Sequence, residues 1–184
     1  VRDNAVYLLD RVNDAQDVLR CIAFDTGKEL WRTEFDAPGK ISHNGSRTTP
    51  TISETMVYAV GMTGGFYAVS RETGKPVWQK NLAQEFPPAD TFRWGYAQSP
   101  SLYKNLVILA PQATNAFVAA FDSQTGALAW KSGDLGGAGY STPVIHSIEG
   151  VDQAVMVSAG GTGGVTGLSL EDGSQLWRYE GWNC

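Results

Sequence analysis

The sequence of 184 residues is poor in the side chains that bind metal ions or carry redox chemistry. It contains two cysteines, Cys21 and Cys184, and two histidines, His43 and His146. The absence of a Cys-x-x-Cys pair and of any Cys/His cluster argues against a structural zinc site and against a thiol-redox site. We interpret Cys21 as a buried, inert thiol in an apolar strand, and both histidines as surface or hydrogen-bonded residues.

Long apolar segments and blocks of like charge are also missing. No apolar stretch approaches the roughly 18 residues that a spanning helix needs, so we predict no transmembrane segment. The 14 Lys and Arg residues and the 19 Asp and Glu residues are scattered, and they give a net charge of −5. This balance argues against nucleic acid as a partner, because nucleic acid selects basic patches.

Helical periodicity is absent as well. No segment keeps apolar residues at positions i, i+3, i+4 and i+7 over three turns, so we predict no helix. The longest irregular connector covers residues 81–97, where Pro87 and Pro88 interrupt any helix. We therefore predict an all-β chain.

The most informative feature is an internal repeat. The pattern Gly-x-x-x-Trp, preceded by Thr or Asp, occurs four times at intervals of about 50 residues, and its members are Gly27 and Trp31, Gly74 and Trp78, Gly126 and Trp130, and Gly173 and Trp177. Each glycine supplies the positive φ of a tight turn between two strands. Each tryptophan is predicted to be a large apolar wedge, largely buried between neighbouring units. A period of this length is typical of repeat architectures.

Upstream of each turn, the units share the signals of further strands. A proline, at position 50, 100 or 143, opens the later units, where no ladder donor is needed. A continuous apolar run such as "MVYAV" (56–60) follows, and this pattern predicts a strand that is covered on both faces. We therefore predict a β-propeller segment of about four blades, each a four-stranded antiparallel sheet. The expected single partial domain, 1–184, has blades at 1–36 (partial), 48–82, 98–132 and 141–180.

The repeated segments resemble a known family. "AFDTGKELW" (23–31), "AVSRETGKPVW" (68–78), "AAFDSQTGALAW" (119–130) and "GLSLEDGSQLW" (167–177) are similar to the Ala-x-Asp-x-x-Thr-Gly-x-x-x-Trp motif of PQQ-like β-propeller repeats. Ser70, Gly167 and Asp172 depart from the motif. The family includes quinoprotein alcohol dehydrogenases and BamB-like propellers. The resemblance implies an open arc of a larger, seven- or eight-bladed ring in a periplasmic or secreted bacterial protein.

The resemblance also says what a PQQ-dependent member needs: adjacent cysteines, a Ca²⁺ ion held by carboxylate and Asn oxygens, and a catalytic Asp. The chain has no Cys-Cys pair, and its acidic residues fall mostly in turns, where they favour turn formation. We therefore expect a non-catalytic binding scaffold, with no catalytic, cofactor-binding or metal-binding residue. The alternative is a fragment of a quinoprotein dehydrogenase whose PQQ and calcium ligands lie outside this chain.

One group of residues is a candidate binding surface. Three links, 43–47, 90–96 and 136–141, precede the inner strand of a blade, and such links meet at one end of a propeller. Arg47, Arg93, Trp94 and Tyr140 are thus candidates for binding a protein, a peptide or a glycan; the alternative is that they pack between blades. The exposed faces of the two end blades are expected to meet the remaining blades of the same protein or a second copy of the chain.

Overall fold

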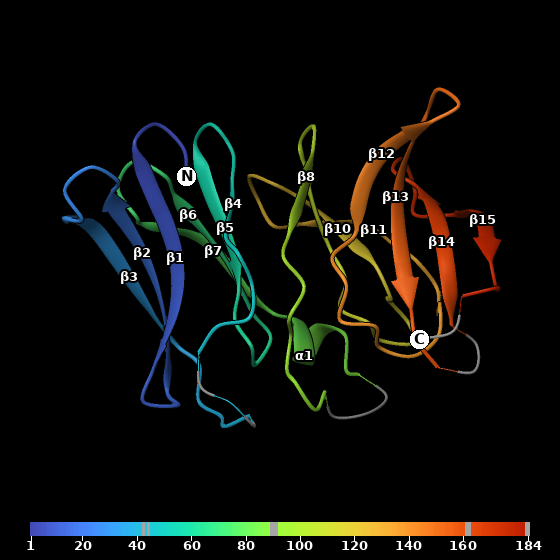
Figure 1. The fold of residues 1–184 in the computed structure, drawn as a ribbon, viewed down its shortest axis with the longest axis horizontal. Helices are drawn as coiled ribbons and strands as arrows, with labels where there is room; N and C mark the ends of the chain where they lie inside the picture. The colour runs from blue at the N-terminus through green and yellow to red at the C-terminus, as the bar shows by residue number, and fades with distance from the viewer. Residues whose placement is uncertain (42, 44, 89–91, 161–162, 183–184) are drawn as a thin grey trace.

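The computed structural model describes residues 1–41, 43, 45–88, 92–160 and 163–182 (Figure 1). The described chain forms one three-stranded and three four-stranded antiparallel sheets. The first sheet contains β1 (Ala5–Val12), β2 (Gln16–Ala23) and β3 (Glu29–Asp36). The second contains β4 (Thr51–Ile52), β5 (Met56–Val60), β6 (Gly65–Ser70) and β7 (Pro76–Asn81). The third contains β8 (Ser101–Tyr103), β9 (Leu106–Leu109), β10 (Ala119–Asp122) and β11 (Leu128–Lys131). The fourth contains β12 (Val144–Ile148), β13 (Val151–Ser158), β14 (Gly164–Ser169) and β15 (Gln175–Tyr179).

In every sheet the strands pair in chain order, and the sheets follow one another as blades of a propeller. In Figure 1 the first sheet and the last sheet lie at opposite sides of the molecule, so the arc is open. The predicted fold class, an all-β propeller segment of about four blades, is confirmed. Within the described residues the first blade has no counterpart of the inner strands β4, β8 and β12. The division of the whole chain into one partial domain stays a prediction.

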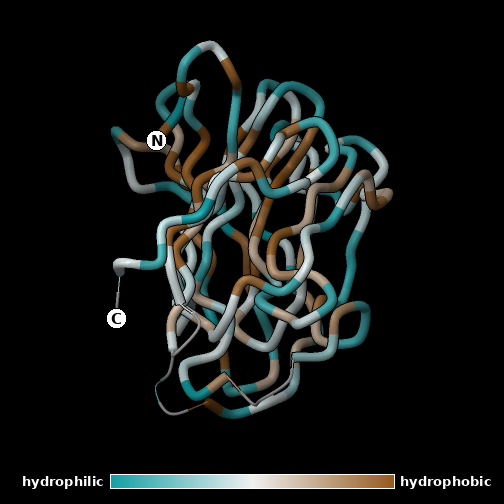
Figure 2. Tube along the Cα trace, turned by 90° about the vertical axis from the view of Figure 1, so that its right-hand side faces the viewer, coloured by the Kyte–Doolittle hydropathy of each residue, from teal (hydrophilic) through white to brown (hydrophobic). Residues whose placement is uncertain are grey.

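Burial reflects the place of each sheet in the arc. All five residues of β5 are buried, whereas burial is interrupted along β1 and β13, the matching strands of the two end blades. The inner sheets have a neighbour on each face and the end sheets have only one, which explains the difference. Three apolar cores fill the spaces between successive blades. Figure 2 shows the corresponding hydrophobic segments along the strands, with hydrophilic stretches in many of the turns.

The repeated tryptophans join each blade to the next one. The indole N–H of Trp31 donates to the carbonyl of Arg71 at 3.0 Å, and that of Trp78 donates to the carbonyl of Ser123 at 3.1 Å. Trp130 donates in the same way to Leu170 at 3.0 Å. Every acceptor lies in the tight turn of the following blade. Trp130 is buried, whereas Trp31 and Trp78 are half-buried.

The turn glycines complete this contact. Gly27, Gly74, Gly126 and Gly173 all have φ between 68° and 74°. A Cβ at Gly126 would lie 2.8 Å from the Trp78 ring, and a Cβ at Gly74 would lie 2.6 Å from the Trp31 ring. At Gly27, in the first blade, a Cβ would meet nothing within 4 Å. At the other end of the arc, the half-buried Trp177 donates to the Gln153 side chain of its own sheet.

Hydroxyl residues beside the prolines link the inner strands. The Ser99 hydroxyl accepts from the Thr49 backbone N–H at 2.9 Å, and Thr142 Oγ1 accepts from the Ser99 N–H at 3.0 Å. Two residues further along the chain, at the first residue of each strand, the Thr51 hydroxyl donates to the Pro100 carbonyl at 2.5 Å and the Ser101 hydroxyl donates to the Pro143 carbonyl at 2.7 Å. Each proline directly precedes its strand, so no ladder donor is lost.

The prediction that the chain has no helix is wrong at one place. Residues Leu82–Glu85 form α1, a single turn in which the Asn81 side chain accepts from the Gln84 N–H. The turn ends before Pro87, as the proline requires. A pattern that extends over three turns cannot reveal one turn, which explains the miss. No helix among the described residues is long and apolar enough to cross a membrane.

Candidate functional site

The candidate binding surface is built by the links that connect one blade to the next. Because the strands are antiparallel, these links lie at the opposite end of the blades from the Gly-x-x-x-Trp turns. The imidazole of His43, in the first link, stacks on Trp94, in the second link, with ring centroids 5.7 Å apart and an interplanar angle of 4°. The Arg93 guanidinium lies 4.8 Å from the centroid of the same indole. The first two links therefore meet at Trp94. We call the three links the loop face.

The third link joins through Phe92. The Phe92 ring meets Tyr140 edge-on, with centroids 6.4 Å apart, and it also meets Tyr96 at 4.9 Å. Tyr140 has a positive φ of 53°, and its N–H donates to the Gln112 side chain at 3.5 Å. Phe92 therefore connects the second and third links. The sequence analysis missed this residue, although its position beside Arg93 and Trp94 was a usable signal.

The four predicted binding residues have different surroundings. Arg93 and Trp94 are exposed, the indole at 36%, and they lie together. Arg47 turns back into its own link, where it donates to the His43 carbonyl at 2.8 Å and lies 3.0 Å from Met62 Sδ. Tyr140 is half-buried. The part of the second link at residues 90 and 91 lies outside the described residues.

Buried polar groups lie close to the loop face. Burial raises the pKa of Tyr96 to about 12. Among the described residues, neither the Tyr96 hydroxyl nor the Gln112 amide nitrogen has a hydrogen-bond partner. The backbone of Tyr96 is held, because its N–H donates to the Met62 carbonyl at 2.9 Å. The Tyr96 hydroxyl and the Gln112 amide are therefore two buried donors beneath the links.

A buried ion pair supports the first link. Arg11 and Asp17 form it at 3.0 Å, with both side chains only 1% exposed. The Arg11 guanidinium also donates to the carbonyls of Ala37 and Gly39, in the segment that leads from β3 to the first link. The Tyr67 hydroxyl donates to the second Asp17 oxygen at 2.9 Å, and burial together with the Asp17 charge raises the pKa of Tyr67. Sequence reasoning missed this network. Arg11 and Asp17 face each other across the β1–β2 hairpin, but Tyr67 reaches Asp17 from the second blade, and a local pattern does not show such a contact.

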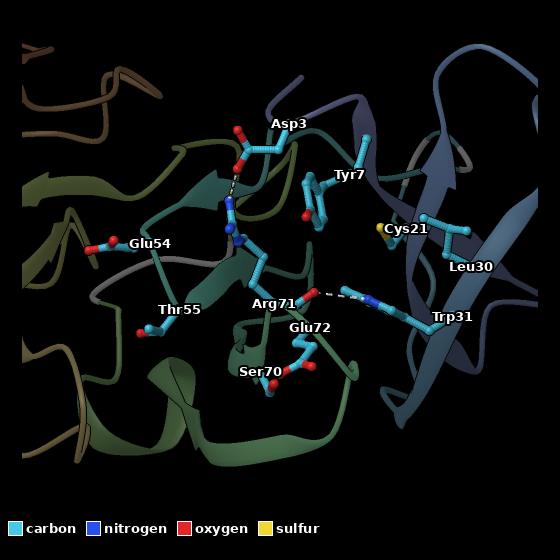
Figure 3. Close-up of a pocket in the computed structure, with 11 residues that line it drawn as sticks. Asp3, Tyr7, Cys21, Leu30, Trp31, Glu54, Thr55, Ser70, Arg71 and Glu72 are labelled. Atoms are coloured by element: carbon cyan, nitrogen blue, oxygen red, sulfur yellow. Dashed lines mark hydrogen bonds and ion pairs between the residues drawn. The ribbon is translucent and has the colours of Figure 1, made fainter.

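A pocket of about 670 Å³ opens between the first two blades, near the turns at the other end of the molecule (Figure 3). Two tilted rings, Tyr7 and Trp31, form one wall, with centroids 5.9 Å apart. Arg71 pairs with Asp3 at 2.6 Å, and Figure 3 shows this pair beside the Tyr7 ring. Burial is the main cause that raises the pKa of both Tyr7 and the neighbouring Cys21 thiol. Sequence analysis named Trp31 and Cys21 of these residues, but as a buried wedge and a buried thiol, and it predicted no pocket here.

The described residues do not fit a calcium site of the kind that PQQ-dependent members need; the quinoprotein alternative places those ligands outside this chain. Calcium takes six to eight oxygen ligands, several of them carboxylates. Nowhere in the described ranges do three or more His, Cys, Asp or Glu side chains gather in a metal-binding arrangement. The turn carboxylates bind locally instead; the Asp122 carboxylate accepts from the Thr125 N–H and hydroxyl, which lowers its pKa. We assign no residue to a metal or a cofactor.

Comparison with known proteins gives both family and fold. The family described as outer membrane protein assembly factor BamB matches at residues 5–130 and 114–181. The chain is 25% identical over 119 residues to the outer membrane protein assembly factor BamB of Xanthomonas campestris pv. campestris. That alignment covers 64% of this chain and 29% of the relative, so the chain spans less than a third of that protein.

Two solved structures show the same fold. BamB from Moraxella catarrhalis has a TM-score of 0.70 and 16% identity, with 100% of this chain and 51% of that chain covered. Quinohemoprotein alcohol dehydrogenase from Comamonas testosteroni has a TM-score of 0.67 and 15% identity, with 98% and 34% covered. One fold thus serves both a dehydrogenase and an assembly factor. With four Gly-x-x-x-Trp units and a family match along nearly its whole length, the chain belongs to the BamB-like family of PQQ-type β-propellers.

Proposed function

We propose that this chain is a non-catalytic part of a bacterial propeller whose loop face binds another protein. The observation that carries the proposal is the exposed cluster of His43, Arg93 and Trp94, which comes from two different links. Tryptophan and arginine are the residue types that most often dominate protein–protein binding energy. The family match supports a binding role, since the relatives are named as assembly factors.

The arrangement also limits the cost of binding. Trp94 contacts both a stacked imidazole and a neighbouring guanidinium, and these contacts restrict its side chain before a partner binds. Immobilising a free side chain on binding costs about 0.5–1.5 kcal/mol, and a pre-ordered one avoids most of that. An exposed indole with an adjacent cation suits a partner surface that offers an apolar or aromatic side chain next to a carboxylate.

We place this function in the cell envelope, periplasmic or secreted. The support is the family, whose named members assemble outer membrane proteins. The remaining blades of the proposed ring, which we take to be seven- or eight-bladed, would cover the two open end blades. A peptide or a glycan on the same loop face is the alternative ligand.

The test places a photo-crosslinking amino acid at position 94 of the full-length protein in its bacterium of origin. The matched control position is Leu128, which is 45% exposed on the outer strand β11, away from the links. We expect a protein adduct at position 94, lost when Arg93 is changed to Ala, and no adduct at position 128. Equal adducts at both positions, or none at position 94, would contradict protein binding at the loop face.

The likeness to a quinohemoprotein dehydrogenase supports a second candidate, a fragment of a PQQ-dependent enzyme. PQQ and Ca²⁺ added to the full-length protein, with dye reduction by alcohols as the readout, distinguish the two. Saturable alcohol-dependent turnover favours the dehydrogenase, and its absence together with the position-94 adduct favours the scaffold.

A further inference from the structure

We propose that the pocket between the first two blades is a second binding site, which takes the guanidinium side chain of an arginine on a partner peptide. Its volume of about 670 Å³ falls within the range of sites that bind small molecules. It lies among the turns, at the opposite end of the blades from the loop face. The two sites are therefore separate, and each proposal can fail without the other.

The pocket exists because one small residue stands where the next blades have large ones. Strand register aligns Tyr7, Cys21 and Trp31 of the first blade with Tyr58, Ala68 and Trp78 of the second. Two positions before the aligned tyrosine, the first blade has Ala5, while the second has Met56 in its core. The third blade has Leu106 at that position. Ala5 therefore leaves open the space that Met56 fills.

The hydroxyl of the aligned tyrosine also behaves differently. In the second blade the Tyr58 hydroxyl crosses to the next blade and donates to the Ser123 carbonyl at 3.1 Å. In the first blade Tyr7 lies opposite Cys21 of its own sheet, and no described hydrogen bond carries its hydroxyl to the second blade. The ring of Tyr7 is half-buried and stands as a wall of the pocket (Figure 3).

The walls match the chemistry of a guanidinium group. The tilted rings of Tyr7 and Trp31 offer faces on which a planar cation stacks. The Trp31 ring is fixed by its hydrogen bond to the Arg71 carbonyl, so the wall is already ordered before a ligand arrives. Leu30, 56% exposed at the rim, offers apolar surface to the aliphatic stem of the ligand.

The charges of the pocket select a cation. Asp3, Glu54 and Glu72 line it, against a single cation, Arg71. Arg71 is already neutralised by Asp3 at 2.6 Å. The two remaining carboxylates are both on exposed residues. A guanidinium presents a fork of donors that a carboxylate can accept in pairs, which favours arginine over a neutral side chain.

The first experiment titrates the chain with Nα-acetyl-arginine amide and follows the indole N–H signals by NMR. The matched probe is Nα-acetyl-citrulline amide, which has nearly the same shape without the charge. We expect saturable shifts that include the Trp31 indole with the arginine probe, and no such shifts with the citrulline probe. Equal binding of both probes, or no shift with either, would overturn the proposal.

Two variants locate the site. Ala5→Met copies the residue of the second blade and fills the pocket, so we expect the shifts to disappear. Glu72→Gln should weaken binding about two- to fivefold, the range for one exposed ion pair. Glu171→Gln is the control, because Glu171 holds the same turn position in the fourth blade, outside the pocket. Undiminished binding to a folded Ala5→Met chain, or equal effects of the two glutamate variants, would refute the site. The glutamate pair decides the question should Ala5→Met not fold.

Discussion

The contact between each tryptophan and the next turn predicts unequal costs for one substitution made at two equivalent glycines. Gly27 and Gly126 have nearly the same backbone, with φ of 68° and 71°. They differ in what an added methyl group meets. At Gly27 it meets nothing within 4 Å, whereas at Gly126 it lies 2.8 Å from the Trp78 ring. Replacing each glycine by alanine therefore separates backbone strain from loss of packing.

The magnitudes follow from these two terms. The left-handed conformation costs an alanine about 1–2 kcal/mol. Alanine also reduces the conformational entropy of the unfolded chain, which offsets about 0.4–1 kcal/mol of this cost. We therefore expect Gly27→Ala to lower the free energy of unfolding by about 1 kcal/mol. At Gly126 the methyl group also pushes against the indole, and overpacking of this kind adds about 1–3 kcal/mol. We expect Gly126→Ala to lower the free energy of unfolding by about 2–4 kcal/mol.

Urea unfolding followed by far-UV circular dichroism measures both losses. With a slope of about 1–3 kcal/mol/M, the predicted difference moves the midpoint by roughly 1 M. Gly133→Ala is the control, since Gly133 has no positive φ and its added methyl meets nothing within 4 Å; its midpoint should stay close to that of the parent. Equal losses at Gly27 and Gly126 would refute the idea that the turn glycine exists to receive the tryptophan.

The remaining predictions concern hydroxyl groups, with urea midpoints as the readout. Tyr96→Phe removes a buried hydroxyl without a described partner and should raise the free energy of unfolding by about 1 kcal/mol. Tyr67→Phe removes a donor to Asp17 and should lower the free energy of unfolding by about 1.5–3 kcal/mol. A loss of stability in both variants would contradict the statement that the Tyr96 hydroxyl is unpaired. Because the folded pKa of Tyr96 is about 12 and its ordinary value is 10, the unfolded chain loses the phenol proton first. Stability is therefore unaffected by this group's ionisation below pH 10 and falls as the pH rises through 12. Tyr96→Phe should therefore reduce the loss of stability between pH 10 and pH 12. Thr51→Val and Ser101→Ala each remove one hydrogen bond between inner strands of neighbouring blades and should each lower the free energy of unfolding by about 1 kcal/mol. Unchanged midpoints would show that these hydrogen bonds do not stabilise the fold.

Most of the fold could be predicted from the sequence because the signals of the repeat are local. A Gly-x-x-x-Trp turn needs a positive φ and a flat apolar side chain, and both requirements are visible in a few consecutive residues. The prolines before β4, β8 and β12 mark strand starts for the same reason. The single turn of α1 was not predicted, because its signals are an Asn cap and a following proline and not a helical periodicity of apolar residues.

Only part of the candidate site could be predicted from the sequence. Links 43–47, 90–96 and 136–141 were predicted to form one surface from topology, since all three precede an inner strand. The sequence did not separate Arg93, which is exposed, from Arg47, which turns back into its own link. That difference depends on Met62, which lies in another connection of the chain.

By itself, then, the sequence determined the blades, their turns and the tryptophans, because these follow from short-range backbone and burial requirements. Only the tertiary structure decided which tryptophan finds a turn to dock on, and why Trp177 bonds within its own sheet. It alone placed Tyr67 of the second blade beside Asp17 of the first and showed that Ala5 opens a pocket between these two blades. These outcomes depend on contacts between residues far apart in the chain, and such contacts exist only once neighbouring blades have packed together.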